Sequence, residues 1–198
     1  MKFALLVLLP LAAHAVIVDR VAVVVGEKVI TTSEIELRIR LASFQNQQQP
    51  DFSLASRQKA AQELIDEKLV EHEMELGHYP QLDADHRKAL IDQYKTTDEA
   101  LASYGLTRRD LEGELARQSD LLSFLNLRFT PAVQVTDQDV QKYIDANAPG
   151  QEAGTEMREA VAKKLTMERA DKELDLWLKD QRKRTHIEYL EKDLEVKP

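Results

Sequence analysis

Two short apolar, β-branched runs near the start of the chain predict a β-hairpin. Val21–Val25 reads VAVVV and Lys28–Thr31 reads KVIT, with only Gly26 and Glu27 between them. A two-residue loop with glycine first is typical of a type II′ turn. Because an isolated hairpin is marginal in water, a third strand is expected. The other β-like segment is the C-terminal HIEYL, His186 to Leu190, which is its expected donor.

The rest of the chain has the three- and four-residue spacing of amphipathic helices. A threonine three residues before a carboxylate predicts helix starts at Thr31, Thr107 and Thr136. We expect the fold class to be mainly α, with several amphipathic helices and a small antiparallel sheet made of the N-terminal hairpin and a C-terminal strand. In the first half of the chain, helices are expected from Thr31 or Thr32 to the polar loop Asn46–Ser53, from that loop to a C-cap at Gly77, near Ala84–Tyr94 and near Asp98–Tyr104. In the second half, they are expected from Thr107 to a break at Pro131, after Thr136, and from about Glu156 to Arg184. The segment PAVQV, from Pro131, is expected to be extended.

The first fifteen residues, MKFALLVLLPLAAHA, have the features of a cleaved signal peptide. Lys2 is a basic start, an apolar run follows, and Ala13-His14-Ala15 is a small-x-small cleavage site. A membrane anchor is the alternative, but the apolar run is shorter than the roughly 18 residues of a spanning helix. We therefore expect an exported, periplasmic protein that begins at Val16 and has no stable membrane insertion.

The composition excludes several kinds of chemistry. Without cysteine, the chain has neither thiol catalysis nor a cysteine-based zinc site. A formal charge of −8 makes nucleic acid a poor partner. His72 and His78 are six residues apart, and a zinc-protease helix needs a spacing of four. No phosphate-binding glycine loop or nucleophile elbow is present, so we expect no enzyme activity, no metal and no cofactor.

Several segments, in order, resemble the SurA family of periplasmic chaperones. VDRVAVVVGEKVITTSEIELR, from Val18, resembles the start of the family's mature proteins, and ELIDEKLVEHEMELG, from Glu63, resembles its second helix. YGLTRRDLEGELARQSDLLSFLNLRF, from Tyr104, and VQVTDQDVQKYI, from Val133, resemble later parts of the chaperone module. The resemblance covers nearly all of Val16 to Leu190 and implies a single chaperone domain over residues 16–198.

The chain departs from the family where parvulin-type prolyl isomerase domains are normally found. Here only ANAPGQEAGT, residues 146–155, stands between the N-terminal part, 16–145, and the C-terminal helix and strand, 156–198. Ten residues are far below the size of a domain. We expect the isomerase domain to be absent and this segment to act as a linker.

The resemblance implies an ATP-independent holdase that binds unfolded polypeptides, in particular outer-membrane proteins, in an apolar groove. Surplus apolar stripes on the helices are the candidates for that groove. For each of these residues, ordinary core packing is the competing interpretation, as it is for Trp177, which is expected to anchor the last helix. The candidate peptide-binding residues are Leu37, Leu41, Phe44, Met74, Leu122, Leu125 and Phe129.

Two other functions remain open. The chain is alternatively a non-catalytic scaffold or assembly subunit, with its apolar surface buried in an oligomer or a dedicated partner. Exchange of the C-terminal helix about the linker would give a homodimer. A minimal isomerase is the third possibility, and the chain length argues against it.

Overall fold

The computed structural model describes residues 19–81, 84–148 and 153–196. The predicted signal peptide and the expected start at Val16 lie outside these residues. Along the chain the elements are β1 (Val21–Val25), β2 (Lys28–Thr31), α1 (Thr32–Gln45), α2 (Leu54–Leu76), α3 (Ala84–Gln93), α4 (Asp98–Ala102), α5 (Arg108–Arg128), the 3-10 turn η1 (Thr130–Ala132), α6 (Asp137–Asn147), α7 (Thr155–Arg184), β3 (Ile187–Tyr189) and the 3-10 turn η2 (Lys192–Leu194).

The first and last strands that the structure describes meet in one small antiparallel sheet of order β2-β1-β3. In its hairpin, Val25 pairs with Lys28, and Gly26 has a φ of 58° while Glu27 keeps a negative φ, as a type II′ turn requires. On the other edge of β1, Val24 pairs with Glu188 of β3. The predicted mainly helical fold, with a sheet made of the N-terminal hairpin and the C-terminal strand, is confirmed.

Local capping chemistry fixes most helix starts where the sequence places them. Thr31, Thr107 and Thr136 each cap a helix, and the carboxylate three residues later accepts a hydrogen bond from the threonine backbone N–H. Gly77 is the C-cap of α2, but its φ is −83° and the left-handed residue is His78, at 50°. A side chain at position 77 would overlap the ring of Tyr79, so that ring would have to move to admit any residue larger than glycine.

Two local predictions need correction. Pro131 and Ala132 are not extended: they lie in η1, because proline is compatible with the first turn of a helix, and the chain becomes extended only from Val133. The segment between the last two helices is also shorter than predicted. Helix α6 continues to Asn147 and α7 already begins at Thr155.

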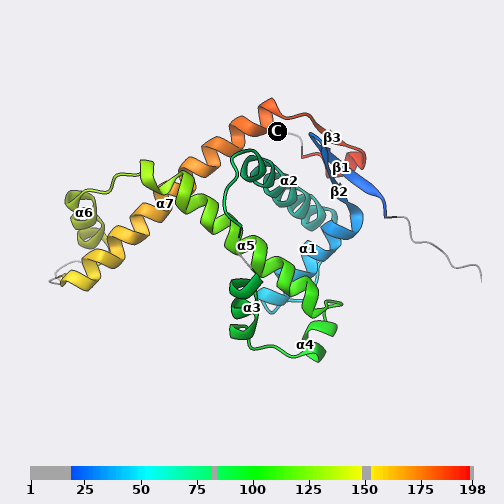
Figure 1. Cartoon of the computed structure of the whole chain (residues 1–198), viewed down its shortest axis with the longest axis horizontal. Coiled ribbons are helices and arrows are strands. Elements are labelled where there is room, and N and C mark those ends of the chain that lie inside the picture. Colours follow the sequence, from blue (N-terminus) through cyan, green and yellow to red (C-terminus); the bar gives the residue numbers. More distant parts are fainter. Residues whose placement is uncertain (1–18, 82–83, 149–152, 197–198) are drawn as a thin grey trace, which may run out of the picture.

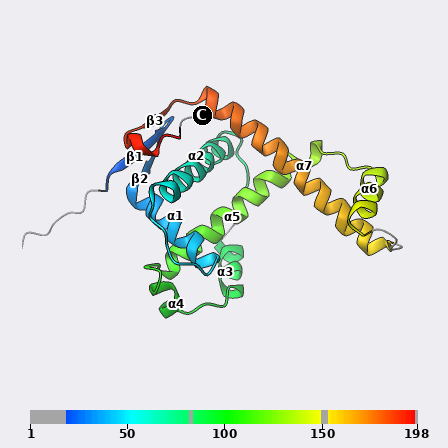
Figure 2. The ribbon, with the colours of Figure 1, turned by 180° about the vertical axis from the view of Figure 1, so that it is seen from behind.

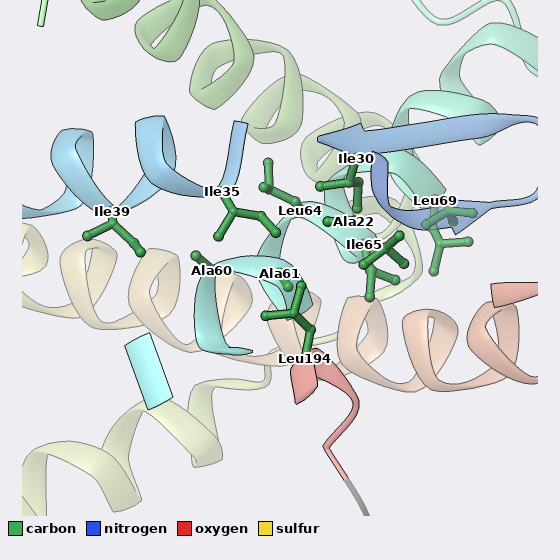
Figure 3. Packing of buried hydrophobic residues seen from close by; sticks show 12 residues of the cluster. Ala22, Ile30, Ile35, Ile39, Ala60, Ala61, Leu64, Ile65, Leu69 and Leu194 are labelled. Atoms are coloured by element: carbon green, nitrogen blue, oxygen red, sulfur yellow. The ribbon is translucent and has the colours of Figure 1, made fainter. Parts of the chain in front are cut away.

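Buried side chains form three clusters. The first, drawn in Figure 3, packs the sheet on α1 and α2 and is completed by Leu194 of η2, which is fully buried. The second gathers Phe124 of α5 with residues of α2 and α7 and with Phe129 and Val133, which flank η1. The third joins α1 to α4 and α5. Helix α1 is therefore covered on both of its apolar stripes, since Ile35 belongs to the first cluster and Leu41 to the third.

The molecule has two parts of different construction (Figures 1 and 2). We call body the sheet, helices α1 to α5 and the second half of α7, which hold the three clusters. We call arm the helix α6 and the first half of α7, residues 155–169, which project away from the body. Helix α7 runs through both parts and returns the chain to the sheet.

Candidate functional site

A groove of about 300 Å³ lies on the body between α2 and α5, with α7 at one end. We call it the α2–α5 groove. Its volume is at the lower end of the range for ligand clefts, which is roughly 300–1,000 Å³. Its lining residues are Arg38, Glu63, Asp66, Glu67, Val70, Glu71, Met74, Glu75, Gln81, Glu114, Arg117, Gln118, Asp120, Leu121, Leu174 and Leu178.

The apolar part of the groove is contributed by three helices. Val70 and Met74 come from α2, Leu121 from α5, and Leu174 and Leu178 from α7. Val70 and Met74 are only 5% and 6% exposed, so they form a floor, whereas Leu121 is 41% exposed and stands at the mouth. Because three elements supply these side chains, the apolar surface exists only in the folded body.

An aromatic cluster supports this floor from behind. Phe124 is fully buried and its ring lies 5.1 Å from that of Tyr79, 5.6 Å from that of Phe129 and 5.7 Å from that of Trp177. The contacts with Tyr79 and Phe129 are edge-to-face, a geometry that stabilises a core beyond the area it buries. Trp177 therefore holds α7 against the body. Its neighbours on this helix, Leu174 and Leu178, are the two groove residues that α7 provides.

The polar part of the groove is an ion network of two arginines and two glutamates. Arg38 of α1 is paired with Glu67 of α2 and, at 3.4 Å, with Glu114 of α5. Arg117 of α5 lies 3.0 Å from Glu67 and 2.5 Å from Glu114. The network ties three helices together and carries no net charge. The Nε atoms of both arginines are buried without a well-oriented acceptor, although Arg117 Nε is the atom 3.0 Å from Glu67.

Burial changes the acidity of one member of this network. Desolvation raises the pKa of the Glu67 carboxyl above 4.5, and the nearby Arg38 and Arg117 oppose that rise without cancelling it. Glu67 therefore exchanges its proton closer to neutral pH than a solvated glutamate does.

The remaining charged residues of the lining are all acidic: Glu63, Asp66, Glu71, Glu75 and Asp120. Cations pair with several of them from outside the groove. Arg182 donates to Asp66 at 2.6 Å, Lys28 pairs with Glu75 and Glu71, Lys68 lies 3.3 Å from Glu71, and Lys59 lies 4.0 Å from Glu63.

The binding residues predicted from the sequence do not lie together in the structure, and three of them are in the third cluster. Leu37, Leu41 and Phe44 belong to the third cluster, where Leu41 is 1% exposed and the Phe44 ring lies 5.4 Å from that of Tyr104. Leu37 also borders a hollow of about 70 Å³ on the α1 side of the ion network. None of the three lines the α2–α5 groove.

The other four predicted residues lie on or near α5 and α2. Met74 lines the groove, while Leu125 and Phe129 are buried behind it in the second cluster, at 4% and 8% exposure. Leu122 is 48% exposed and lies outside the groove, next in sequence to Leu121, which lines it.

Sequence reasoning missed the ion network and most of the groove. Glu114 follows the buried Leu111 by three residues and so shares its helix face, which is a signal that could have marked this glutamate as buried. Leu121, Leu174 and Leu178 carried no such signal, because their role depends on how three helices meet.

No protein-family model matches this sequence, and the comparison with curated proteins gives no match either. In the part of the chain that the structure describes, no helix is long and apolar enough to cross a membrane. Within the same residues, no group of three or more histidine, aspartate or glutamate side chains is arranged to hold a metal ion.

Proposed function

We propose that this protein is an ATP-independent chaperone of the periplasm, which holds unfolded polypeptides, in particular outer-membrane proteins, without catalysing a reaction on them. The α2–α5 groove is the observation that carries this proposal. It offers accessible apolar surface on a folded, acidic chain, which is what transient capture of an unfolded segment requires.

The composition of the groove favours reversible binding. Met74 is a flexible thioether that adapts to side chains of different shape. A groove of about 300 Å³ accommodates a few side chains at a time. Contacts of this extent give modest affinity, and a holdase that works without ATP has to release its clients by dissociation.

Aggregation of a client protein tests the proposal directly. The chain from Val16 is mixed with a urea-unfolded outer-membrane protein, the mixture is diluted into buffer, and light scattering is followed. We expect suppression near equimolar ratio. The variant Leu121→Ser places a hydroxyl at the groove mouth and should suppress less, whereas Leu122→Ser, at an equally exposed leucine outside the groove, should act like the unchanged chain. Absence of suppression by a chain that circular dichroism shows to be folded would refute the proposal.

The shape of the arm favours a second candidate, a non-catalytic scaffold subunit. A projecting pair of helices with Met157 and Met167 exposed is suited to pairing with another chain, including a second copy. Sedimentation across a wide concentration range separates the two functions. A scaffold stays in one oligomeric state, while a holdase remains able to bind clients as a monomer.

A further inference from the structure

We propose that the α2–α5 groove selects uncharged apolar polypeptide segments and disfavours segments that carry a charge of either sign. This inference rests on the proposed function and adds the chemical class of segment that the groove accepts. It is carried by the pairing of the charged side chains around the apolar floor, and it gives a role in specificity to cations that lie outside the lining.

Four charges of the lining neutralise one another in the ion network. Glu67 is paired with both Arg38 and Arg117, and so is Glu114. Gln118 also donates a hydrogen bond to Glu114 at 2.7 Å. A charged segment could gain a partner here only by breaking a pair, which would leave a buried charge uncompensated.

A further carboxylate of the lining, that of Asp66, is neutralised from outside the groove. The Nε atom of Arg182 donates to Asp66 at 2.6 Å. The Nη atoms of Arg182 donate to the side-chain oxygen and the backbone carbonyl of Gln62, at 2.6 and 2.9 Å. Three hydrogen bonds therefore hold this guanidinium in place, although Arg182 is not part of the lining.

The lysines of β2 and α2 neutralise two more carboxylates of α2. Lys28, which follows the hairpin turn, pairs with Glu75 and lies 4.0 Å from Glu71. Lys68 lies 3.3 Å from Glu71. Two carboxylates are thus matched by two ammonium groups, and neither lysine belongs to the lining.

The last two acidic residues of the lining are not free either. Glu63 lies 4.0 Å from Lys59, and Asp120 also has an interaction partner. Every charged side chain among the lining residues that the structure describes is therefore already partnered. A charged side chain that enters the groove loses water without gaining an unpaired opposite charge. An uncharged apolar side chain has no such cost and gains contact with the apolar floor.

The cations outside the lining therefore determine which segments the groove accepts. If one of them is removed, its carboxylate remains in the lining without a partner. Electrostatic complementarity then favours a basic segment over an acidic one. The preference for uncharged segments should consequently change when Arg182 or Lys28 is replaced, even though neither residue lines the groove.

Peptide binding tests the inference. Three fluorescent peptides share the core Leu-Val-X-Val-Leu between Gly-Ser flanks, and X is glutamine, lysine or glutamate. Fluorescence anisotropy should give dissociation constants about fivefold higher for the lysine and glutamate peptides than for the glutamine peptide, because a charge is desolvated without compensation. The two charged peptides should differ from each other by less than about twofold, since exposed and already paired groups discriminate weakly between signs.

Variants of the neutralising cations should introduce a preference for one sign. Arg182→Gln leaves Asp66 unpaired, so the lysine peptide should bind roughly twofold more tightly and the glutamate peptide roughly twofold more weakly. Lys28→Gln, which frees Glu75, should act in the same direction. Lys183→Gln removes the same charge from an exposed residue outside the groove and should change none of the affinities.

Two further measurements locate the effect. Leu121→Ser should weaken binding of all three peptides, and Leu122→Ser should weaken none. Raising salt to about 0.5 M should remove the preference that Arg182→Gln introduces, because screening is short-ranged there. Circular dichroism of each variant confirms that it is folded.

The outcomes separate this inference from the function on which it rests. Equal affinity for all three peptides, or a clear preference of the unchanged chain for one sign of charge, overturns the inference and leaves capture in the groove intact. Suppressed aggregation of the outer-membrane protein with no binding of any peptide overturns the groove as the site, while the holdase function stands. No suppression of aggregation removes the proposed function, while the order of the peptide affinities still decides the inference.

Discussion

The body and the arm use the same kind of helix but are stabilised very differently. In the body, every long helix packs against at least two other elements, and three clusters fill the space between them. In the arm, α6 packs on one partner, the first half of α7, and its buried side chains are Val140 and Ile144. A helix of this length is marginal without tertiary packing, so its stability depends on one contact face.

Polar contacts add to the packing of α6 on α7 but contribute little stability. Arg169 reaches Asp139 at 3.1 Å, and Arg158 donates to Gln141 at 2.7 Å. Exposed pairs of this kind contribute at most about 1 kcal/mol each. The groove therefore lies on the part of the molecule with more packing, and we expect the arm to be the part that opens locally.

The largest expected effect is in the aromatic cluster of the body. Phe124→Ala removes a fully buried ring in contact with Tyr79, Phe129 and Trp177. The free energy of unfolding should fall by about 3–5 kcal/mol, the usual range for such a cavity. Urea unfolding followed by the fluorescence of Trp177 measures it. A loss below about 1 kcal/mol would show that this cluster is not part of the cooperative core.

The second effect tests the closure of the body by its last turn. Leu194 is fully buried in the first cluster, close to the end of the chain. Leu194→Ala should lower the free energy of unfolding by about 2–3 kcal/mol, at the low end of the range for leucine because a terminal turn can relax. Val196→Ala, at a residue that is 54% exposed, is the control and should change it by less than about 0.5 kcal/mol.

The third prediction separates the arm from the body. Ile144 is 3% exposed, so its replacement by alanine removes as much local packing as a change in the body would. We expect the amides of α6 to lose most of their hydrogen-exchange protection. The unfolding midpoint reported by Trp177, a body residue, should move by less than the equivalent of about 1 kcal/mol. A shift as large as that of Phe124→Ala would mean that arm and body unfold as one unit.

The smallest expected effect is the pH dependence of stability that comes from two carboxyl groups, one in the body and one in the arm. Burial raises the pKa of Glu67 in the body above 4.5, while hydrogen bonds from Thr136 lower the pKa of Asp139 in the arm below 3.8. The contribution of Glu67 to stability is therefore full below its unfolded pKa and is lost as pH rises through its folded value. That of Asp139 is present above its unfolded pKa and is lost as pH falls through its folded value.

Carboxyl chemical shifts measured by NMR between pH 2 and 7 check this contrast. The Glu67 resonance should titrate above 4.5, and that of Asp139 below 3.8. On acidification the cap of α6 should fray, whereas protonation of Glu67 does not by itself weaken the body. Glu67 titrating at or below 4.5 would show that the two arginines outweigh its burial.

Local signals made much of the fold predictable. The capping pairs at Thr31, Thr107 and Thr136 and the two-residue turn at Gly26 act within a few residues, so the sequence alone locates them. The third strand was predictable because an isolated two-stranded hairpin is only marginally stable in water. The 3-10 turn that buries Leu194 was not, because nothing in EKDL distinguishes it from a solvated end.

The groove escaped prediction for a geometric reason. The predicted stripe on α5 ran through Leu122 and Leu125, as for a helix with one straight buried face. Instead α5 packs on α1 and α3 and also on α7 and η1, so its buried face changes along its length and Phe124 takes the central place. Leu122 is left in solvent and Leu121 meets the groove. A side chain's face on such a helix depends on partners far away in sequence.

The strand order carries a consequence for the kinetics of folding. Strand β1 is the middle strand, and one of its edges is completed by β3, close to the other end of the chain. The hairpin and the helix pair of the arm join segments that are neighbours in the sequence. Pairing Val24 with Glu188, in contrast, closes a loop that contains α1 to α7. Such closure has a high entropic cost and gives slow folding. During synthesis, β1 can be paired on this edge only after β3 has emerged, which is after all of α1 to α7.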